Sequence, residues 1–206
     1  IKISQRYSRY GWLIVVNEGK MGTMFQVCQS CGAAVANPPP KDWKKSHSNP
    51  FTGRPCKGFK DTYTYALGHK FMTDILELRF EGPLANQAED NTWRSVLYAL
   101  LEGASESLGI RRDDLDGTLY YSQGSKVPSI ILYDDVPGGA GHVKRVLNDL
   151  PDTILAARER VSLDCCGPET SCTECLRNYR NQPYHEELKR GLAKSFLDEL
   201  VRTFNL

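Results

Sequence analysis

The seven cysteines of this chain fall into two groups whose spacing is typical of metal sites. The first group opens with Cys28 and Cys31, a C-x-x-C pair followed directly by a glycine. The tight turn of such a pair lets both thiolates reach one ion, and zinc is the ion that tetrahedral sulfur sites typically hold. Together with His47 and Cys56 the pair forms the pattern C-x2-C-x15-H-x8-C, which predicts a first zinc site. His69 competes as the fourth ligand.

The segment that would carry this site, residues 32–60, is rich in proline and loop-like. A long irregular stretch inside a compact domain needs a brace, and a bound metal supplies ordering free energy that a small core cannot. The other interpretations are a reactive dithiol or ordinary buried cysteines. A thioredoxin-like pair would lie between a strand and a helix, whereas here a proline-rich loop follows.

The second group predicts an all-cysteine site closed within one loop. Four sulfurs fall within eleven residues, at Cys165, Cys166, Cys172 and Cys175. The side chains of adjacent cysteines diverge, so Cys165 is either a ligand at some conformational cost or a bystander. In the second case His185 or Asp164 completes the shell. The sequence therefore predicts two Zn²⁺ ions and leaves the last ligand of the second open.

Length and charge limit the class of protein. The 206 residues allow one large or two small domains, and a formal net charge of +1 argues against DNA binding by bulk charge alone. Any basic surface must therefore be local. The longest apolar runs, Trp12–Val16 and Ile130–Tyr133, are too short to cross a bilayer, so we expect no membrane association.

The odd cysteine count and the absence of a signal-peptide pattern favour a reducing compartment, so we expect a cytoplasmic protein. The chain begins with Ile1 rather than Met, which indicates a piece of a longer polypeptide or a processed product.

Hydrophobic patterning predicts an α+β fold. A β-rich N-terminal part, residues 1–82, carries the zinc-knuckle loop. An α/β part, residues 83–206, ends in the cysteine-rich zinc loop and a C-terminal helix. Strands are expected within 6–28 and over 62–68, 74–80, 117–122 and 128–135. Helices are expected over 90–108, from near 141, over 151–161 and from Pro183 onward.

The segment "CCGPETSCTECLRNYRNQPYHEELKRGLAKSFL" resembles the C-terminal zinc-binding module of MrfA-type superfamily 2 helicases, the MZB domain. Upstream, "LYDDVPGGAGHVKRVL", "LGHKFMTDILELRF" and "FQVCQSCGAAVANP" with "HSNPFTGRPCKG" resemble the larger domain of unknown function that carries this module. Its relatives include C-terminal regions of DEAD/DEAH-type helicases and the DrmB protein of the DISARM anti-phage system. The resemblance extends from about Tyr10 to Leu200.

This resemblance implies a non-catalytic accessory region, with no catalytic residue of its own, that works with an ATP-dependent DNA helicase in anti-phage defence or DNA repair. The motor would lie on the same chain or on a partner subunit. The sequence has no G-x-x-x-x-G-K-[ST] phosphate loop and no Asp-Glu-x-His box. The alternative is a protein-interaction scaffold that docks a helicase subunit without contacting DNA.

Basic and aromatic residues after Cys175 are the first candidates for nucleic-acid contact. Arginines can bind phosphates without reading bases, and tyrosines can stack on unpaired bases. The arginines could instead only neutralise the thiolates of the zinc site. The candidates are Arg177, Tyr179, Arg180, Lys189 and Arg190, with Tyr184 as a further stacking residue.

Two other features have competing interpretations. Asp134 and Asp135 end an apolar strand before a glycine-rich turn and His142, an arrangement that suits either a metal-dependent nuclease or a tight strand-to-helix crossover capped by aspartates. Trp43 with its neighbouring lysines forms a small basic–aromatic patch that suits a nucleic acid or a protein partner; the lysines are Lys41, Lys44 and Lys45.

Overall fold

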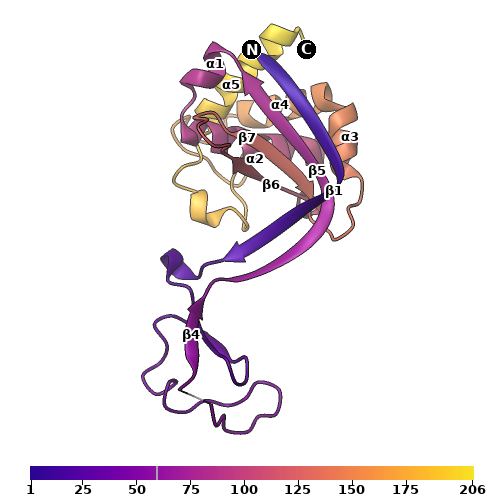
Figure 1. Cartoon of the computed structure of the whole chain (residues 1–206). Helices are drawn as coiled ribbons and strands as arrows, with labels where there is room; N and C mark the ends of the chain where they lie inside the picture. Colours follow the sequence, from indigo (N-terminus) through magenta and orange to yellow (C-terminus); the bar gives the residue numbers. More distant parts are fainter. Residues whose placement is uncertain (59) are drawn as a thin grey trace. The chain divides into compact units, whose positions relative to one another are not determined.

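The structure of the chain, a computed structural model, describes residues 1–58 and 60–206 (Figure 1). They form two compact units. Ile1–Gly11 with Met72–Leu206 make up the helical unit, and Trp12–Phe71 make up the knuckle unit. The long strands β1 (Lys2–Asn17) and β5 (Leu67–Glu81) each contribute residues to both. These units are defined by contacts and are not consecutive along the chain. The domain division at residue 82 that the sequence suggests stays a prediction.

The helical unit contains a sheet with the strand order β1-β5-β7-β6. Strand β7 (Ser129–Asp134) pairs antiparallel with both β5 and β6 (Leu115–Tyr120). Strand β7 lies inside the sheet, and its apolar run "SIILY" places Ile130 and Leu132 in the core with no exposure to solvent.

The helices of this unit pack around α2 (Asp90–Leu108). Its apolar positions recur every three or four residues, so one face is buried continuously from Trp93 to Ala104. Gly109 ends the helix in the left-handed conformation at φ 61°, as C-terminal glycines do. The other helices are α1 (Pro83–Gln87), α3 (His142–Asn148), α4 (Leu150–Ser162) and α5 (Arg190–Phe204), and 3-10 turns cover Lys20–Gly22, Arg112–Asp114 and Gln182–Tyr184.

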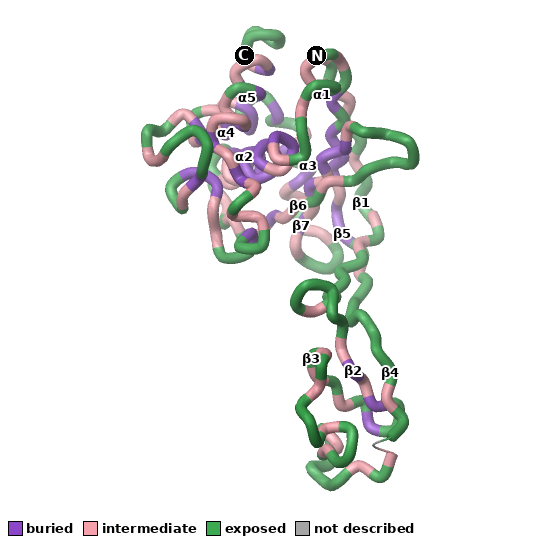
Figure 2. Tube along the Cα trace, turned by 90° about the vertical axis from the view of Figure 1, so that its left-hand side faces the viewer, coloured by how far each residue is buried: buried purple, intermediate pink, exposed green. Residues whose placement is uncertain are grey.

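Two packing features hold α2 in place. Gly103 lets α4 approach closely, because a Cβ at this position would lie 2.5 Å from both the Ala157 nitrogen and the Thr153 carbonyl oxygen. The rings of Phe80, Trp93 and Phe196 join β5, α2 and α5, with centroids 5.1 to 5.7 Å apart. The helical unit therefore has an apolar core of its own, visible as the concentration of buried residues in Figure 2.

The knuckle unit has a small antiparallel sheet of order β3-β2-β4 and, in the part that the structure describes, no comparable core. Its strands are β2 (Phe25–Cys28), β3 (Ala34–Ala36) and β4 (Thr62–Tyr65). Among its described residues only Gln26, Cys28 and Cys31 are buried. Its fold therefore depends on something other than burial of apolar side chains.

The structure confirms the expected fold class, α+β with a β-rich N-terminal part, and corrects several boundaries. The strand expected over 74–80 begins at Leu67, and a short strand, β3, lies within the segment expected to be loop-like. The last helix begins at Arg190 rather than at Pro183. Pro183 instead enters a 3-10 turn, because the chain up to residue 189 is held by contacts with the cysteine loop and with α2. No helix in the described part of the chain has the length and apolar character needed to cross a membrane.

Candidate metal centres

The first cysteine pair lies on the hairpin that joins β2 to β3. Cys28 is the last residue of β2, and its N–H donates to the Ala33 carbonyl at 2.9 Å. Gly32 closes the turn with φ 72°, a conformation that glycine adopts readily, and donates to the Cys28 carbonyl at 2.9 Å. This turn places the sulfurs of Cys28 and Cys31 on one side of the hairpin.

The proline-rich loop brings the other two side chains to the same point. The Cys56 N–H donates to the His47 carbonyl at 2.8 Å, and Ser48 and Pro55 form an antiparallel bridge beside it. One ligand atom from each of Cys28, Cys31, His47 and Cys56 lies within 4.8 Å of the other three. His69 lies elsewhere in the unit and stacks on Phe71, with ring centroids 5.3 Å apart.

The separations fit a tetrahedral zinc ion. Cys28 Sγ and Cys56 Sγ are 3.8 Å apart, and Cys31 Sγ lies 3.3 Å from His47 Nε2. Zinc with usual bond lengths gives tetrahedral edges of about 3.8 Å between two sulfurs and about 3.6 Å between sulfur and nitrogen. A disulfide would need about 2.05 Å, and all seven cysteines are free.

His47 is oriented by a residue that the sequence suggested for another role. Its Nδ1–H donates to the Trp43 carbonyl at 3.1 Å, which leaves the Nε2 lone pair directed at the sulfurs. The Trp43 ring stacks on the imidazole at 4.5 Å between centroids and 13° between planes. Such outer contacts fix the tautomer and the ring position of metal-binding histidines.

Backbone donors prepare one thiol of this cluster for a metal. Burial raises the pKa of Cys28, but hydrogen bonds from the backbone N–H groups of Cys31 and Ser30, together with those of the His47 and Cys31 side chains, bring the pKa down to about 7. Because metals bind the thiolate, the protein favours the reactive form of Cys28 near neutral pH.

The second cysteine group also converges. Its sulfurs are separated by 3.8 Å (Cys166 to Cys175), 3.9 Å (Cys172 to Cys175) and 4.0 Å (Cys165 to Cys166), close to the edge of about 3.8 Å expected for zinc. All four lie within 4.8 Å of one another. His185 does not join them, since its Nε2 lies 2.9 Å from Asn181 Oδ1 and 3.1 Å from the Asn178 carbonyl oxygen.

The backbone around this cluster forms a second knuckle. The N–H groups of Leu176 and Arg177 donate to the Cys172 carbonyl at 3.1 and 2.9 Å, and the Cys172 N–H donates to Cys175 Sγ at 3.2 Å. Unlike the first cluster, this one adjoins the core, because Cys175 and Leu176 are almost fully buried.

Arg190 connects the second cluster to the helices on both sides. The residue is 8% exposed, and its guanidinium donates to the Val161 carbonyl at 3.1 Å and to the Cys166 carbonyl at 2.6 Å. Its own N–H donates to the Thr170 carbonyl, and the N–H of Gly191 donates to the Pro168 carbonyl, both at 2.8 Å. The end of α4, the cysteine loop and the start of α5 are thereby held together.

The other residues suggested for nucleic-acid contact differ in their availability. Arg177 donates to Ser171 Oγ at 3.0 Å and to the His185 carbonyl at 3.0 Å. Arg180 is paired with Asp135 at 2.5 Å, Asp113 at 3.5 Å and Asp116 at 3.8 Å. Lys189 is 3.7 Å from the Glu169 carboxylate, and Tyr184 lies under the guanidinium of Arg94. Tyr179 is 85% exposed.

Asp134 has a structural task at the strand-to-helix crossover. Its carboxylate has no exposure to solvent and accepts three backbone N–H bonds, from Ala140 at 2.6 Å, His142 at 3.1 Å and Val143 at 2.9 Å. These bonds satisfy the glycine-rich turn and the first turn of α3. The arrangement is the capped crossover, and the carboxylate faces backbone donors rather than an open metal position.

The comparisons with known proteins agree with this geometry. Residues 96–176 match the sequence model of the MrfA Zn-binding domain, MZB. The matched segment begins on α2 and ends one residue after Cys175, so it includes the whole second cluster. This chain contains an MZB-type domain.

Two known proteins are similar to this chain beyond that segment. Druantia protein DruE of Escherichia coli is 31% identical over 212 residues, which cover 90% of this chain and 11% of DruE. The crystal structure of the DUF1998 helicase MrfA bound to DNA superposes with a TM-score of 0.51 at 14% identity, over 97% of this chain and 26% of MrfA. The second match shows a shared fold. The chain spans about a tenth and a quarter of these two proteins, respectively.

Proposed function

We propose that this chain is a zinc-stabilised, non-catalytic accessory region of an ATP-dependent DNA helicase system that helps the motor to engage nucleic acid. The observation that carries the proposal is the second cluster, which lies inside the MZB match and joins α4, the cysteine loop and α5. The chain is similar in sequence to a Druantia protein and in fold to a helicase crystallised with DNA. Anti-phage defence and DNA repair are the settings we propose, with the motor on the same polypeptide or on a partner.

The proposal assigns four ligands to each Zn²⁺. The ions would lock the two loops that carry their ligands, and they supply no chemistry beyond this structural support. The ligands are Cys28, Cys31, His47 and Cys56 for the first ion and Cys165, Cys166, Cys172 and Cys175 for the second.

A protein-interaction scaffold is the second candidate, and specific contacts favour it. Three of the arginines after Cys175 are engaged within the protein, Arg177 and Arg190 with backbone carbonyls and Arg180 with carboxylates. Each of these three guanidinium groups therefore already has partners within the protein. Tyr179 stays the proposed stacking residue of this region because its ring is exposed, and Lys189 stays a proposed phosphate contact.

A salt titration of DNA binding separates the two candidates. The purified chain is titrated with fluorescent single-stranded DNA from about 50 to about 200 mM salt, a range over which phosphate contacts weaken steeply. The accessory function predicts binding at low salt that falls with a constant slope on logarithmic axes. The absence of binding at the lowest salt, together with stable association with a helicase chain, would replace the proposal with the scaffold.

A further inference from the structure

Positive charge is concentrated in the knuckle unit. Eight of the chain's 26 Lys and Arg lie within residues 12–71, but only three of its 25 Asp and Glu do. The knuckle unit therefore carries a formal charge of +5 and the helical unit −4, although the chain as a whole carries +1. Such an asymmetry within one chain is the electrostatic footprint of an anionic partner at the basic part.

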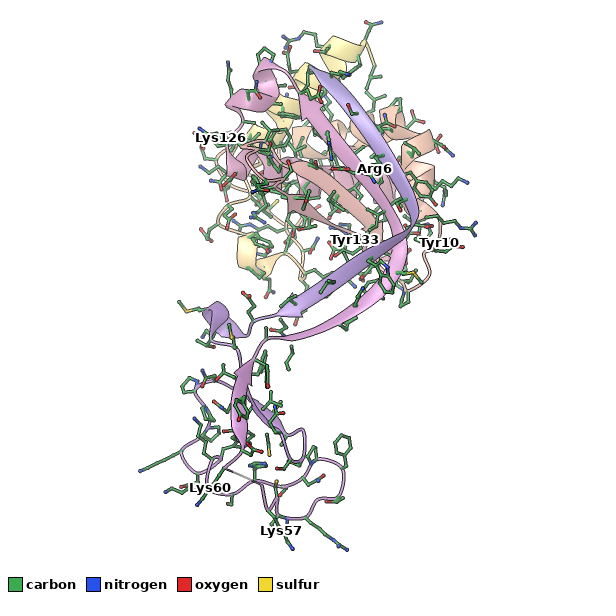
Figure 3. The ribbon with its side chains drawn as sticks, viewed as in Figure 1. Arg6, Tyr10, Lys57, Lys60, Lys126 and Tyr133 are labelled. Carbon is green, nitrogen blue, oxygen red and sulfur yellow. The ribbon has the colours of Figure 1, made fainter. Side chains whose placement is uncertain are left out.

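Most of this charge lies on the loop that contributes half of the first metal cluster. Residues 41–57, here named the basic loop, contain His47 and Cys56 together with five exposed cations. Figure 3 shows the side chain of one of them, Lys57, extending away from the ribbon. The only acid of the loop, Asp42, pairs with Lys45 at 3.3 Å in an exposed bridge that neutralises little. The five cations are Lys41, Lys44, Lys45, Arg54 and Lys57.

The basic loop also presents an aromatic ring to solvent. Phe51 is 87% exposed. Its position is fixed by Asn49, whose Oδ1 accepts the N–H groups of Phe51 at 2.8 Å and Thr52 at 3.1 Å, and whose carbonyl accepts the Gly53 N–H at 2.9 Å. These bonds order the backbone of the turn that carries the exposed ring.

We infer that the basic loop is a binding surface for single-stranded DNA, in which the five cations contact phosphates and Phe51 stacks on an unpaired base. The chemistry matches on both counts, since non-specific single-strand sites combine a basic track with an aromatic platform. An unpaired base offers the exposed face that a ring such as Phe51 needs, and a duplex does not. This inference rests on the proposed function and moves the main DNA contact from the residues after Cys175 to the knuckle unit.

The test compares two triple variants of the full chain by fluorescence anisotropy with a single-stranded oligonucleotide. The loop variant carries Lys41→Gln, Lys44→Gln and Lys57→Gln. The matched control carries Lys2→Gln, Lys126→Gln and Lys144→Gln, three exposed lysines of the helical unit. Each lost phosphate contact reduces the logarithmic salt slope by about 0.7, so the loop variant should lose about 2 from the slope and bind on the order of a hundredfold more weakly near 0.1 M salt. The control should keep the slope of the parent.

A third variant, Phe51→Ala, separates stacking from charge. We expect affinity to fall roughly 5- to 150-fold with the salt slope unchanged, because stacking on a base is insensitive to counterions. Every variant should retain two zinc ions per chain, which verifies that the loop is still folded.

The outcomes distinguish this inference from the function on which it rests. If the loop variant binds DNA as tightly as the parent, or if the control variant loses as much affinity as the loop variant, the basic loop is not the binding site. Either result would leave the proposed accessory function in place. A parent chain that fails to bind DNA even at low salt would remove both.

Discussion

Replacing Asp134 with alanine should destabilise the helical unit rather than abolish a reaction. The carboxylate is fully buried and accepts three backbone N–H groups at 2.6 to 3.1 Å. A bond to a charged acceptor contributes about 1.5 to 3 kcal/mol, and removing the acceptor leaves three buried donors without a partner. Water entering the space left behind recovers part of this, so we expect a loss of about 4 kcal/mol in the free energy of unfolding.

Urea denaturation followed by circular dichroism at the helix minimum measures this loss, since α2, α4 and α5 all belong to the helical unit. Asp135→Ala is the matched control. Its carboxylate lies next in sequence but pairs with the partly exposed Arg180, so the cost should be about 1 kcal/mol or less. If Asp134→Ala unfolded like the parent and instead removed a divalent-metal-dependent nuclease activity, the assignment of Asp134 to the crossover would be wrong.

Three further predictions address the clusters and the packing. Cys28→Ser should expose the amides of residues 12–71 to hydrogen exchange while those of α2 stay protected, because the described residues of the knuckle unit form no apolar core. Equal loss of protection in both units would contradict this. Trp43→Ala should lower the zinc affinity of the first site by roughly 10- to 100-fold in a chelator competition and leave that of the second site unchanged, since Trp43 stacks on His47. Unchanged affinity at the first site would show that the stacking is incidental. Gly103→Ala should lower the free energy of unfolding by about 1 to 3 kcal/mol, because its Cβ would meet the α4 backbone; a neutral effect would mean that α4 can shift freely.

The elements that the sequence predicted well are those with a strong local signal. The helix over 90–108 was expected to end at Gly109 and does so, because its apolar spacing and its stop residue agree. The two cysteine groups were found from spacing alone, since a C-x-x-C turn is a local structure. The geometry shows that both groups are suited to zinc, and the match to the MZB domain includes the second group.

The features that the sequence did not predict depend on contacts between distant residues. Pro183 is a typical first-turn residue, and the sequence therefore predicts a helix that begins there. In the structure α5 begins at Arg190, because the Arg190 side chain is bound to the end of α4 and to the cysteine loop. The proposed assignment of Cys165 rather than His185 as a ligand depends on the position of Asn181, whose Oδ1 lies 2.9 Å from His185 Nε2. The sequence predicts Trp43 as part of a patch for a nucleic acid or a protein partner, and its contact with His47 is visible only once the loop is folded.

The zinc content of the purified chain, counted by elemental mass spectrometry, tests the central claim most directly. We predict two zinc ions per chain, and one in each of the single-site variants Cys28→Ser and Cys172→Ser. A metal-free chain that keeps its fold and its hydrogen-exchange protection in excess chelator would contradict the account.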